Sequence, residues 1–172
     1  MERWVVAAKR ADFAAIGKEF GIDPVIARLI RNRDVQDREE IRRYLYGTVK
    51  ELASPHLMKD VDKAVEILRN KIKEKKRIRI IGDYDIDGVV STFILLRGLK
   101  RTGALADTYI PDRVADGYGI HEHLIERASA DGIDVIVTCD NGIAAYNEIA
   151  MAKEKGMTVI VTDHHEIPYK ET

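Results

Sequence analysis

The second half of the chain alternates between short apolar runs and longer amphipathic stretches. Runs rich in Ile and Val predict buried strands, and the stretches between them, which stop at Gly103, Gly132 and Gly156, predict helices. The predicted strands cover residues 77–82, 106–110, 134–139 and 158–162, and the predicted helices cover 89–101, 121–130 and 144–155. Buried strands joined by helices form parallel sheets that are covered on both faces. The pattern therefore predicts an α/β fold, a mostly parallel sheet with flanking helices.

The first 60 residues carry shorter helical patterns with recognisable start signals. Asp12 and Asp23 each precede an apolar helical face and are predicted N-caps, and Pro24 suits the first position of the second helix. Asp37 and Glu40 have the spacing of a capping box. A DNA-binding helix-turn-helix motif is the alternative. Packing explains these apolar faces, however, and the second helix lacks a clear set of side chains that could contact DNA bases.

The pattern breaks at residues 54–56, which predicts a helical N-terminal region over 1–60 and a second region over 61–172. The second region opens with an amphipathic helix that leads into a basic run from Lys71 to Arg79. Basic residues late in a helix complement its dipole, so we expect a solvated basic face. Contact with nucleic acid is the alternative for the same run.

Composition narrows the class of protein without naming a function. With 45% hydrophobic and 33% charged residues, the sequence is typical of a globular domain rather than a disordered or membrane protein. A net charge of -1 neither indicates nor excludes binding to nucleic acid. The single cysteine, Cys139, excludes an internal disulfide, fits a cytoplasmic protein and is expected in the core of a strand.

Polar residues follow every predicted strand. In chain order they are Asp83, Asp85 and Asp87, then Asp112, Arg113 and Asp116, then Asp140, and finally Asp163, His164 and His165. The carboxyl ends of parallel strands meet at one edge of the sheet, which is where open α/β proteins bind ligands. We therefore expect these side chains to share one crevice. Taken alone, Asp140 also suits the N-cap of the next helix.

Three acids at every second position repel one another unless a cation lies between them. An EF-hand loop is excluded because its twelfth position needs Glu and is Ile94 here. A phosphatase of the haloacid-dehalogenase type leaves the His pair unexplained. Carboxylates mixed with imidazoles suit Mn²⁺ or Mg²⁺, and their number predicts two ions. Two such ions support hydrolysis of a phosphoester or phosphoanhydride by an activated water, without a covalent intermediate.

Four motifs in this order resemble the DHH phosphoesterase family, which is named for Asp-His-His. They are Asp83-Tyr-Asp-Ile-Asp-Gly88, Ile110-Pro-Asp-Arg113 with Gly117-Tyr-Gly119, Thr138-Cys-Asp-Asn-Gly-Ile143 and Val161-Thr-Asp-His-His165. Within that family the chain is most similar to the RecJ-type single-stranded-DNA exonucleases. The resemblance implies a two-metal nuclease that removes nucleotides from the 5′ end of single-stranded DNA in repair and recombination, with no role at a membrane.

The resemblance also implies roles for individual residues. The metal ligands it implies are Asp83, Asp85, Asp87, Asp140 and His164, with Asp140 as the bridge. His165 is expected to meet the scissile phosphate, Asp163 to orient the His pair, and Arg113 to hold a substrate phosphate.

One departure from the family pattern concerns length. The sequence stops at Thr172, whereas the family has a further acidic ligand and a second domain downstream. We therefore expect an N-terminal fragment that binds metal weakly and is nearly inactive. Two alternatives to the exonuclease stay open: a DHH enzyme acting on an oligoribonucleotide, cyclic dinucleotide or pyrophosphate, and a non-catalytic relative that serves as a replication scaffold.

Overall fold

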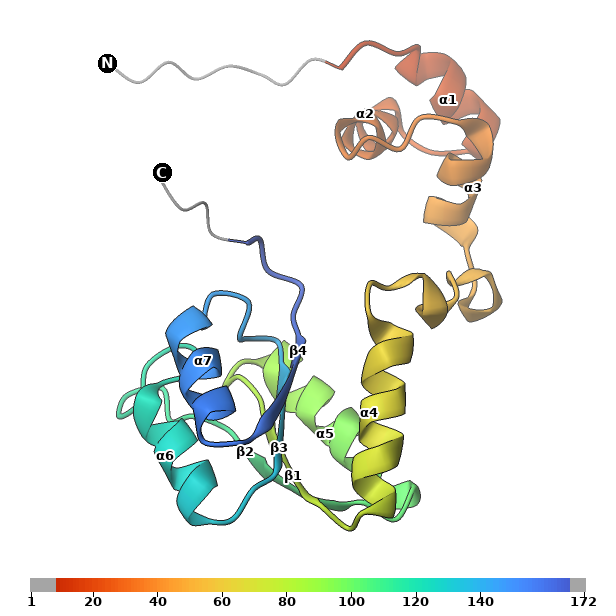
Figure 1. The fold of residues 1–172 in the computed structure, drawn as a ribbon. Helices are drawn as coiled ribbons and strands as arrows, with labels where there is room; N and C mark the ends of the chain where they lie inside the picture. Colours follow the sequence, from red (N-terminus) through yellow and green to blue (C-terminus); the bar gives the residue numbers. More distant parts are fainter. Residues whose placement is uncertain (1–8, 168–172) are drawn as a thin grey trace, which may run out of the picture. The chain divides into compact units, whose positions relative to one another are not determined.

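The computed structural model describes residues 9–167, which divide into two compact units (Figure 1). The first unit runs to Leu57 and the second begins at Met58. Among the described residues, no helix is both long and apolar enough to cross a membrane.

The first unit consists of short helices whose starts follow the expected caps. Its elements are α1 (Phe13–Phe20), α2 (Pro24–Asn32), α3 (Arg38–Tyr46) and the 3₁₀ turns η1 (Val49–Glu51) and η2 (Pro55–Leu57). The Asp12 and Asp23 side chains accept from backbone N–H groups of the first turns, and Asp37 and Glu40 form the reciprocal capping box. The predicted caps are confirmed, and Ala27, Ile30 and Ile41 supply the buried apolar side chains.

The second unit is built on a four-stranded sheet of order β2-β1-β3-β4. The strands are β1 (Arg77–Ile81), β2 (Leu105–Tyr109), β3 (Val135–Cys139) and β4 (Thr158–Thr162), and every pairing is parallel. The predicted fold class is confirmed. Strand β1 lies between β2 and β3, so the chain leaves β1 toward one edge of the sheet and later returns on its other side.

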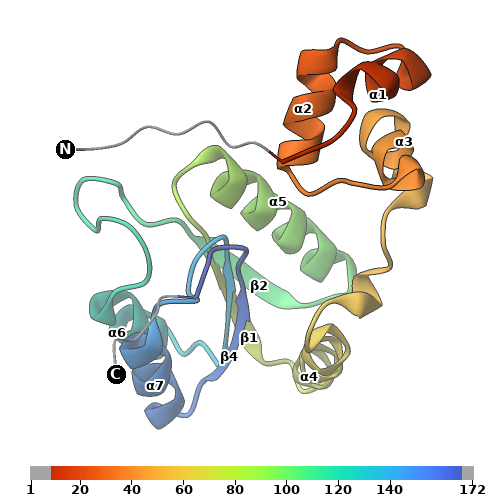
Figure 2. The same ribbon diagram turned by 90° about the horizontal axis from the view of Figure 1, so that it is seen from above.

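Helices cover both faces of this sheet (Figure 2). Helices α4 (Val61–Lys73) and α5 (Ile86–Arg101) pack on one face against Ile78, Ile80 and Val137, while α6 (Glu122–Ala130) and α7 (Tyr146–Glu154) pack on the other. Strand β3 is buried along its whole length because one helical layer covers each of its two faces. Cys139 is in this strand and is buried, as expected.

Two sequence-based expectations need correction. Helix α5 begins at Ile86 rather than at residue 89, because the Asp85 side chain caps it by accepting from the Gly88 N–H at 2.9 Å. Asp140 caps no helix, since α7 begins only at Tyr146 with Ala145 as its N-cap residue.

The basic run is not one solvated helical face. Helix α4 ends at Lys73, and Arg79 is a residue of β1 with 9% of its surface exposed. Its guanidinium donates to both Asp107 carboxylate oxygens at 2.8 Å and to Asp131 Oδ2 at 2.7 Å. The expectation was wrong for Arg79, because a strand that is covered on both faces takes a charged side chain inward only with paired partners.

Candidate metal centre

The candidate site lies where β1 and β3 end side by side. These neighbouring strands connect to opposite edges of the sheet, and such a switch point opens a crevice at the carboxyl edge. Asp83 follows β1 and Asp140 follows β3. The buried Asn141 side chain joins the two strand ends by donating from Nδ2 to the Gly82 carbonyl oxygen at 2.6 Å.

The turn after β3 has an unusual backbone. Asp140 has a φ of 61°, which is the left-handed region, and Gly142 has a φ of 102°. A Cβ at position 142 would lie 2.8 Å from Thr138 Oγ1, so both the conformation and the space require glycine. A non-glycine residue held in this region is an observation that points to function. The turn directs the Asp140 carboxylate into the crevice.

Two overlapping groups of side chains in the crevice have the spacing of metal ligands. Asp83, Asp85 and Asp140 form one group, and Asp140, His164 and His165 form the other. Within each group the ligand atoms lie within 4.8 Å of one another. Asp140 is the residue common to both, which is the arrangement that a bridging ligand needs.

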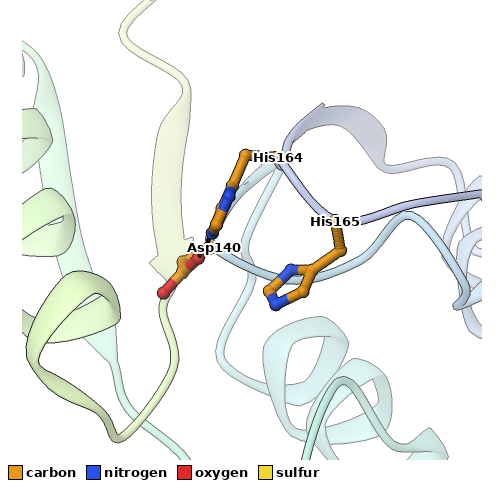
Figure 3. Close-up of side chains that lie close together, drawn as sticks. All are labelled: Asp140, His164 and His165. Carbon is orange, nitrogen blue, oxygen red and sulfur yellow. Dashed lines mark ion pairs between the residues drawn. The ribbon is translucent and has the colours of Figure 1, made fainter. Parts of the chain in front are cut away.

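The donor set and the state of its oxygens fit divalent metal ions. Asp83 Oδ1 and Asp140 Oδ1 are buried without a hydrogen bond, a costly condition for carboxylate oxygens. His164 Nε2 lies 2.9 Å from Asp140 Oδ1, but the contact lacks hydrogen-bond alignment (Figure 3). Carboxylates with imidazole are ligands that suit Mn²⁺ and related ions. A cation in the crevice would satisfy both orphaned oxygens.

The pKa shifts around the crevice reflect a concentration of negative charge. Burial raises the pKa of Asp140, the neighbouring Asp85 carboxylate raises it further, and His164 opposes the shift. In contrast, the pKa of Asp85 is lowered, chiefly because its carboxylate accepts from the Gly88 N–H. Burial and then the negative charges of Asp163 and Asp83 raise the pKa of the Tyr118 hydroxyl. The crevice is thus strongly negative.

The two histidines have different surroundings. His164 extends to Asp140 (Figure 3). His165 is held by Asp163, whose Oδ1 lies 2.7 Å from His165 Nδ1. Asp163 Oδ2 accepts from the Ile143 N–H at 2.9 Å, so Asp163 is fixed by the turn after β3. Burial acts to raise the pKa of Asp163, but hydrogen bonds from Ile143 and His165 lower it overall. The Asp163 hydrogen bond raises the pKa of His165.

The remaining predicted residues lie around this crevice. Asp87 is in the first turn of α5, exposed and outside both groups, and it lines a neighbouring hollow with Asp140 and His164. Arg113 is exposed, and its guanidinium carbon lies 5.3 Å from the centre of the Tyr84 ring. The structure therefore brings together every predicted metal ligand except Asp87.

Two residues near the site had no predicted role. Asn141 links β3 to β1, and Tyr118 Oη lies 3.3 Å from His165 Nε2. Asn141 belongs to an Asp-Asn-Gly turn, which signals a tight turn but not a bond to another strand. Tyr118 precedes a glycine in a loop. Its position marks it as an aromatic ring near the crevice but gives no sign of the contact with His165.

Comparison with known proteins agrees with this geometry. Residues 77–172 match the DHH family, N-terminal domain. The chain belongs to the DHH family. The DHH motif that names the family is Asp163-His164-His165, where Asp163 holds His165 and His164 reaches Asp140.

Curated relatives of this DHH chain are single-stranded-DNA-specific exonucleases named RecJ. The protein from Bacillus subtilis (strain 168) is 36% identical over 165 residues, which are 95% of this chain and 21% of the relative. The protein from Escherichia coli (strain K12) is 37% identical over 145 residues, which are 84% of this chain and 24% of the relative. The chain thus spans about a fifth to a quarter of the length of these relatives.

Solved structures show the same likeness. A crystal structure of exonuclease RecJ bound to manganese matches with a TM-score of 0.64 and 38% identity, covering 69% of this chain and 30% of the other. RecJ from Thermus thermophilus in complex with Mn²⁺ matches with a TM-score of 0.64 and 26% identity, covering 92% of this chain and 22% of the other.

Proposed function

We propose that this chain carries the metal-binding half of a 5′→3′ exonuclease site for single-stranded DNA, in a protein of repair or recombination. The observation that carries the proposal is the pair of ligand groups sharing Asp140, one of which includes His165, the imidazole fixed by Asp163. Similarity to RecJ exonucleases, two of them crystallised with manganese, supports the substrate and the ion.

The metal proposal assigns a set of residues to two Mn²⁺ or Mg²⁺ ions. Asp83, Asp85, Asp140 and His164 would hold them, with Asp140 shared and Asp87 available from the first turn of α5. When bound, such ions supply an activated water and neutralise charge on the phosphate.

The protein residues orient the substrate around that centre. His165 is kept in one orientation because Asp163 accepts from its Nδ1. Its Nε2 lies 3.3 Å from the Tyr118 hydroxyl, and the scissile phosphate would take the place of that contact. Arg113, supported on Tyr84, offers a planar donor for another phosphate of the strand. The proposal also assigns residues 1–60 to a helical N-terminal region and residues 61–172 to the N-terminal part of the DHH catalytic domain. It places the protein in the cytoplasm.

Two measurements test the proposal, first of metal binding and then of hydrolysis. Calorimetric titration with Mn²⁺ should give two ions per chain, and Asp140→Asn should abolish at least one. Hydrolysis of a labelled single-stranded oligodeoxynucleotide is then followed with the chain in excess over DNA, so that slow turnover is still visible. We expect Mn²⁺-dependent release of mononucleotides from the 5′ end, lost in His165→Ala.

Matched substrates separate the alternatives. Duplex DNA of the same sequence, a dinucleotide, a cyclic dinucleotide and pyrophosphate are offered under the same conditions. Faster hydrolysis of a small substrate than of single-stranded DNA would replace the exonuclease with a small-substrate phosphoesterase. Unchanged Mn²⁺ binding in Asp140→Asn would contradict the metal site and favour a scaffold, whereas absence of hydrolysis alone agrees with the weak activity expected of this chain.

A further inference from the structure

The loop over residues 110–121, between β2 and α6, contacts the site at two points. Its Arg113 guanidinium lies over the Tyr84 ring. Its Tyr118 ring packs edge-on against Tyr84 and His165, with centroid distances of 6.4 and 6.0 Å. The Tyr118 hydroxyl also lies 3.3 Å from His165 Nε2. One loop thus presents both the candidate phosphate donor and a neighbour of the fixed imidazole.

Apolar packing does not explain how the middle of this loop is held. Pro111 and Ile120 are buried at its ends, but between them Val114 is 94% exposed. Asp112 Oδ1 accepts from the N–H groups of Val114 and Ala115, at 2.9 and 2.8 Å. These bonds shape the turn locally, and they do not attach it to the rest of the domain.

Asp116 makes that attachment. Its side chain is only 12% exposed, and it contacts the loop's own backbone and two other elements of the domain. Oδ2 accepts from the Asp112 N–H at 2.8 Å and from the Tyr109 hydroxyl of β2 at 3.2 Å, and Oδ1 lies 2.8 Å from His123 Nε2 of α6. The pKa of Asp116 is lowered, first by the Asp112 N–H, so the carboxylate is charged at neutral pH and each hydrogen bond is charge-assisted.

We propose that Asp116 is a positioning residue that fixes the 110–121 loop to β2 and α6, so that Arg113 and Tyr118 stand beside the site. Arg113 is long and exposed, so its place over Tyr84 depends on the backbone that carries it. Losing the Asp116 carboxylate removes the bonds to β2 and α6 together. The role of the loop in DNA binding rests on the proposed function, whereas the fixing of the loop does not.

Nuclear magnetic resonance of the chain tests the positioning without any activity. Asp116→Ala should speed hydrogen exchange of the amides of residues 112–119 at least tenfold. It should also remove the upfield ring-current shift that Tyr84 gives the Arg113 side chain. Glu126→Ala, which removes an exposed acid of α6, is the matched control and should change neither. Exchange in β1 and β3 should stay as in the unmodified chain.

Two results would overturn the proposal. One is an Asp116→Ala chain whose loop exchange and Arg113 shift are unchanged. The other is equal acceleration in the loop and the sheet, which indicates general destabilisation. If Asp116→Ala does not fold, His123→Ala removes one exposed partner and should accelerate loop exchange by a smaller factor, and no acceleration there would contradict the proposal.

A binding cycle separates this inference from the proposed function. With a 5′-phosphorylated single-stranded oligodeoxynucleotide, Arg113→Ala and Asp116→Ala should each weaken binding, and the double variant should be less than twofold weaker than Arg113→Ala alone. Independent, multiplicative losses would show that Asp116 does not act through Arg113. If Arg113→Ala binds as well as the unmodified chain, the proposed phosphate contact fails, while loop exchange still decides the positioning role.

Discussion

At the scale of single residues, Asp140 combines several costs in one place. It has a left-handed backbone, a buried carboxylate, a raised pKa and an acidic neighbour in Asp85. None of these stabilises the fold, and a bound cation offsets the electrostatic ones. These costs are what the proposed role of Asp140 as a metal ligand would explain.

Replacement of Asp140 by Asn should separate stability from binding. Asn tolerates the left-handed region, so the turn after β3 is preserved. In EDTA at neutral pH the variant should melt at a higher temperature than the unmodified chain, because a buried charge is gone; each kcal/mol gained raises the Tm by about 2–4 °C. Its Mn²⁺ affinity should fall by more than about tenfold, since even outer-sphere partners of metal ligands contribute that much.

Calorimetry and thermal melts measure the two effects. A variant that melts lower in EDTA than the unmodified chain would show that the Asp140 charge is not a burden to the metal-free fold. Asp107→Asn, in the middle of β2 and outside both ligand groups, is the control for removal of a carboxylate, and it should leave Mn²⁺ affinity unchanged.

The spacing of acids and histidines predicted which side chains lie close together, except for Asp87, whose direction depends on where helix α5 begins. Asp83, Asp140 and His164 follow adjacent strands, so topology alone brings them together. Asp87 has the same spacing from Asp85 as Asp85 has from Asp83, but the helix begins at Ile86, and the alternation ends there. Asn141 was not predictable as a link because its partner is a carbonyl of another strand.

At the scale of elements, the junction of β1 and α5 is packed too closely for a side chain. A Cβ on Gly82 would meet Thr92 Oγ1 and Cβ, and Thr92 in turn contacts Cys139 Sγ at 3.2 Å. Helix α5 therefore lies directly against the ends of β1 and β3. This close approach sets the position of its N-terminal turn, where Asp85 and Asp87 are found.

Gly82→Ala should destabilise the chain by about 2 kcal/mol, the usual cost of overpacking a buried site. Because the main obstacle is the Thr92 hydroxyl, Thr92→Ala in the same chain should recover part of the loss. Urea unfolding of the single and double variants measures this. Strictly additive losses would mean that the two residues do not compete for space.

Whether a segment forms a helix or a strand was predictable from its periodicity. The ends of these elements, and the ion pairs between residues far apart in sequence, were not. The apolar runs identified all four strands, because burial on both faces leaves little room for polar residues. Arg79 was the exception, and its partners Asp107 and Asp131 lie 28 and 52 residues further along the chain. No local pattern reveals a pair that only the sheet register creates.

At the scale of the whole molecule, Asp140 and the paired carboxylates at the amino edge of the sheet respond oppositely to acid. At the amino edge, the pKa of Asp134 is lowered, mainly by the Arg77 N–H, and that of Asp131 is lowered by Arg79. A lowered folded pKa stabilises the fold above the unfolded value, near 3.9, and this stability is lost as pH falls through the folded pKa. Asp140, with its raised pKa, acts in the other direction.

We expect net loss of stability below about pH 4, to which Asp131 and Asp134 contribute together with other carboxylates of lowered pKa, such as Asp85, Asp116 and Asp163. Asp134→Asn should cost about 1 kcal/mol at pH 7, the order of a charge-assisted bond to a partly exposed group, and should lose less stability than the unmodified chain between pH 5 and 3. Urea midpoints across this range provide the measurement. Parallel pH profiles for the two chains would contradict the assignment to Asp134.

The link between Asn141 and Gly82 has a consequence for folding. It joins two strand ends that lie 59 residues apart, and the acids it brings together come from equally distant segments. An unfolded chain offers a cation only groups that are near one another in sequence, such as Asp83 with Asp85 or His164 with His165. A bound ion would thus be a ligand of the tertiary structure, and its affinity would report how completely β1 and β3 have paired.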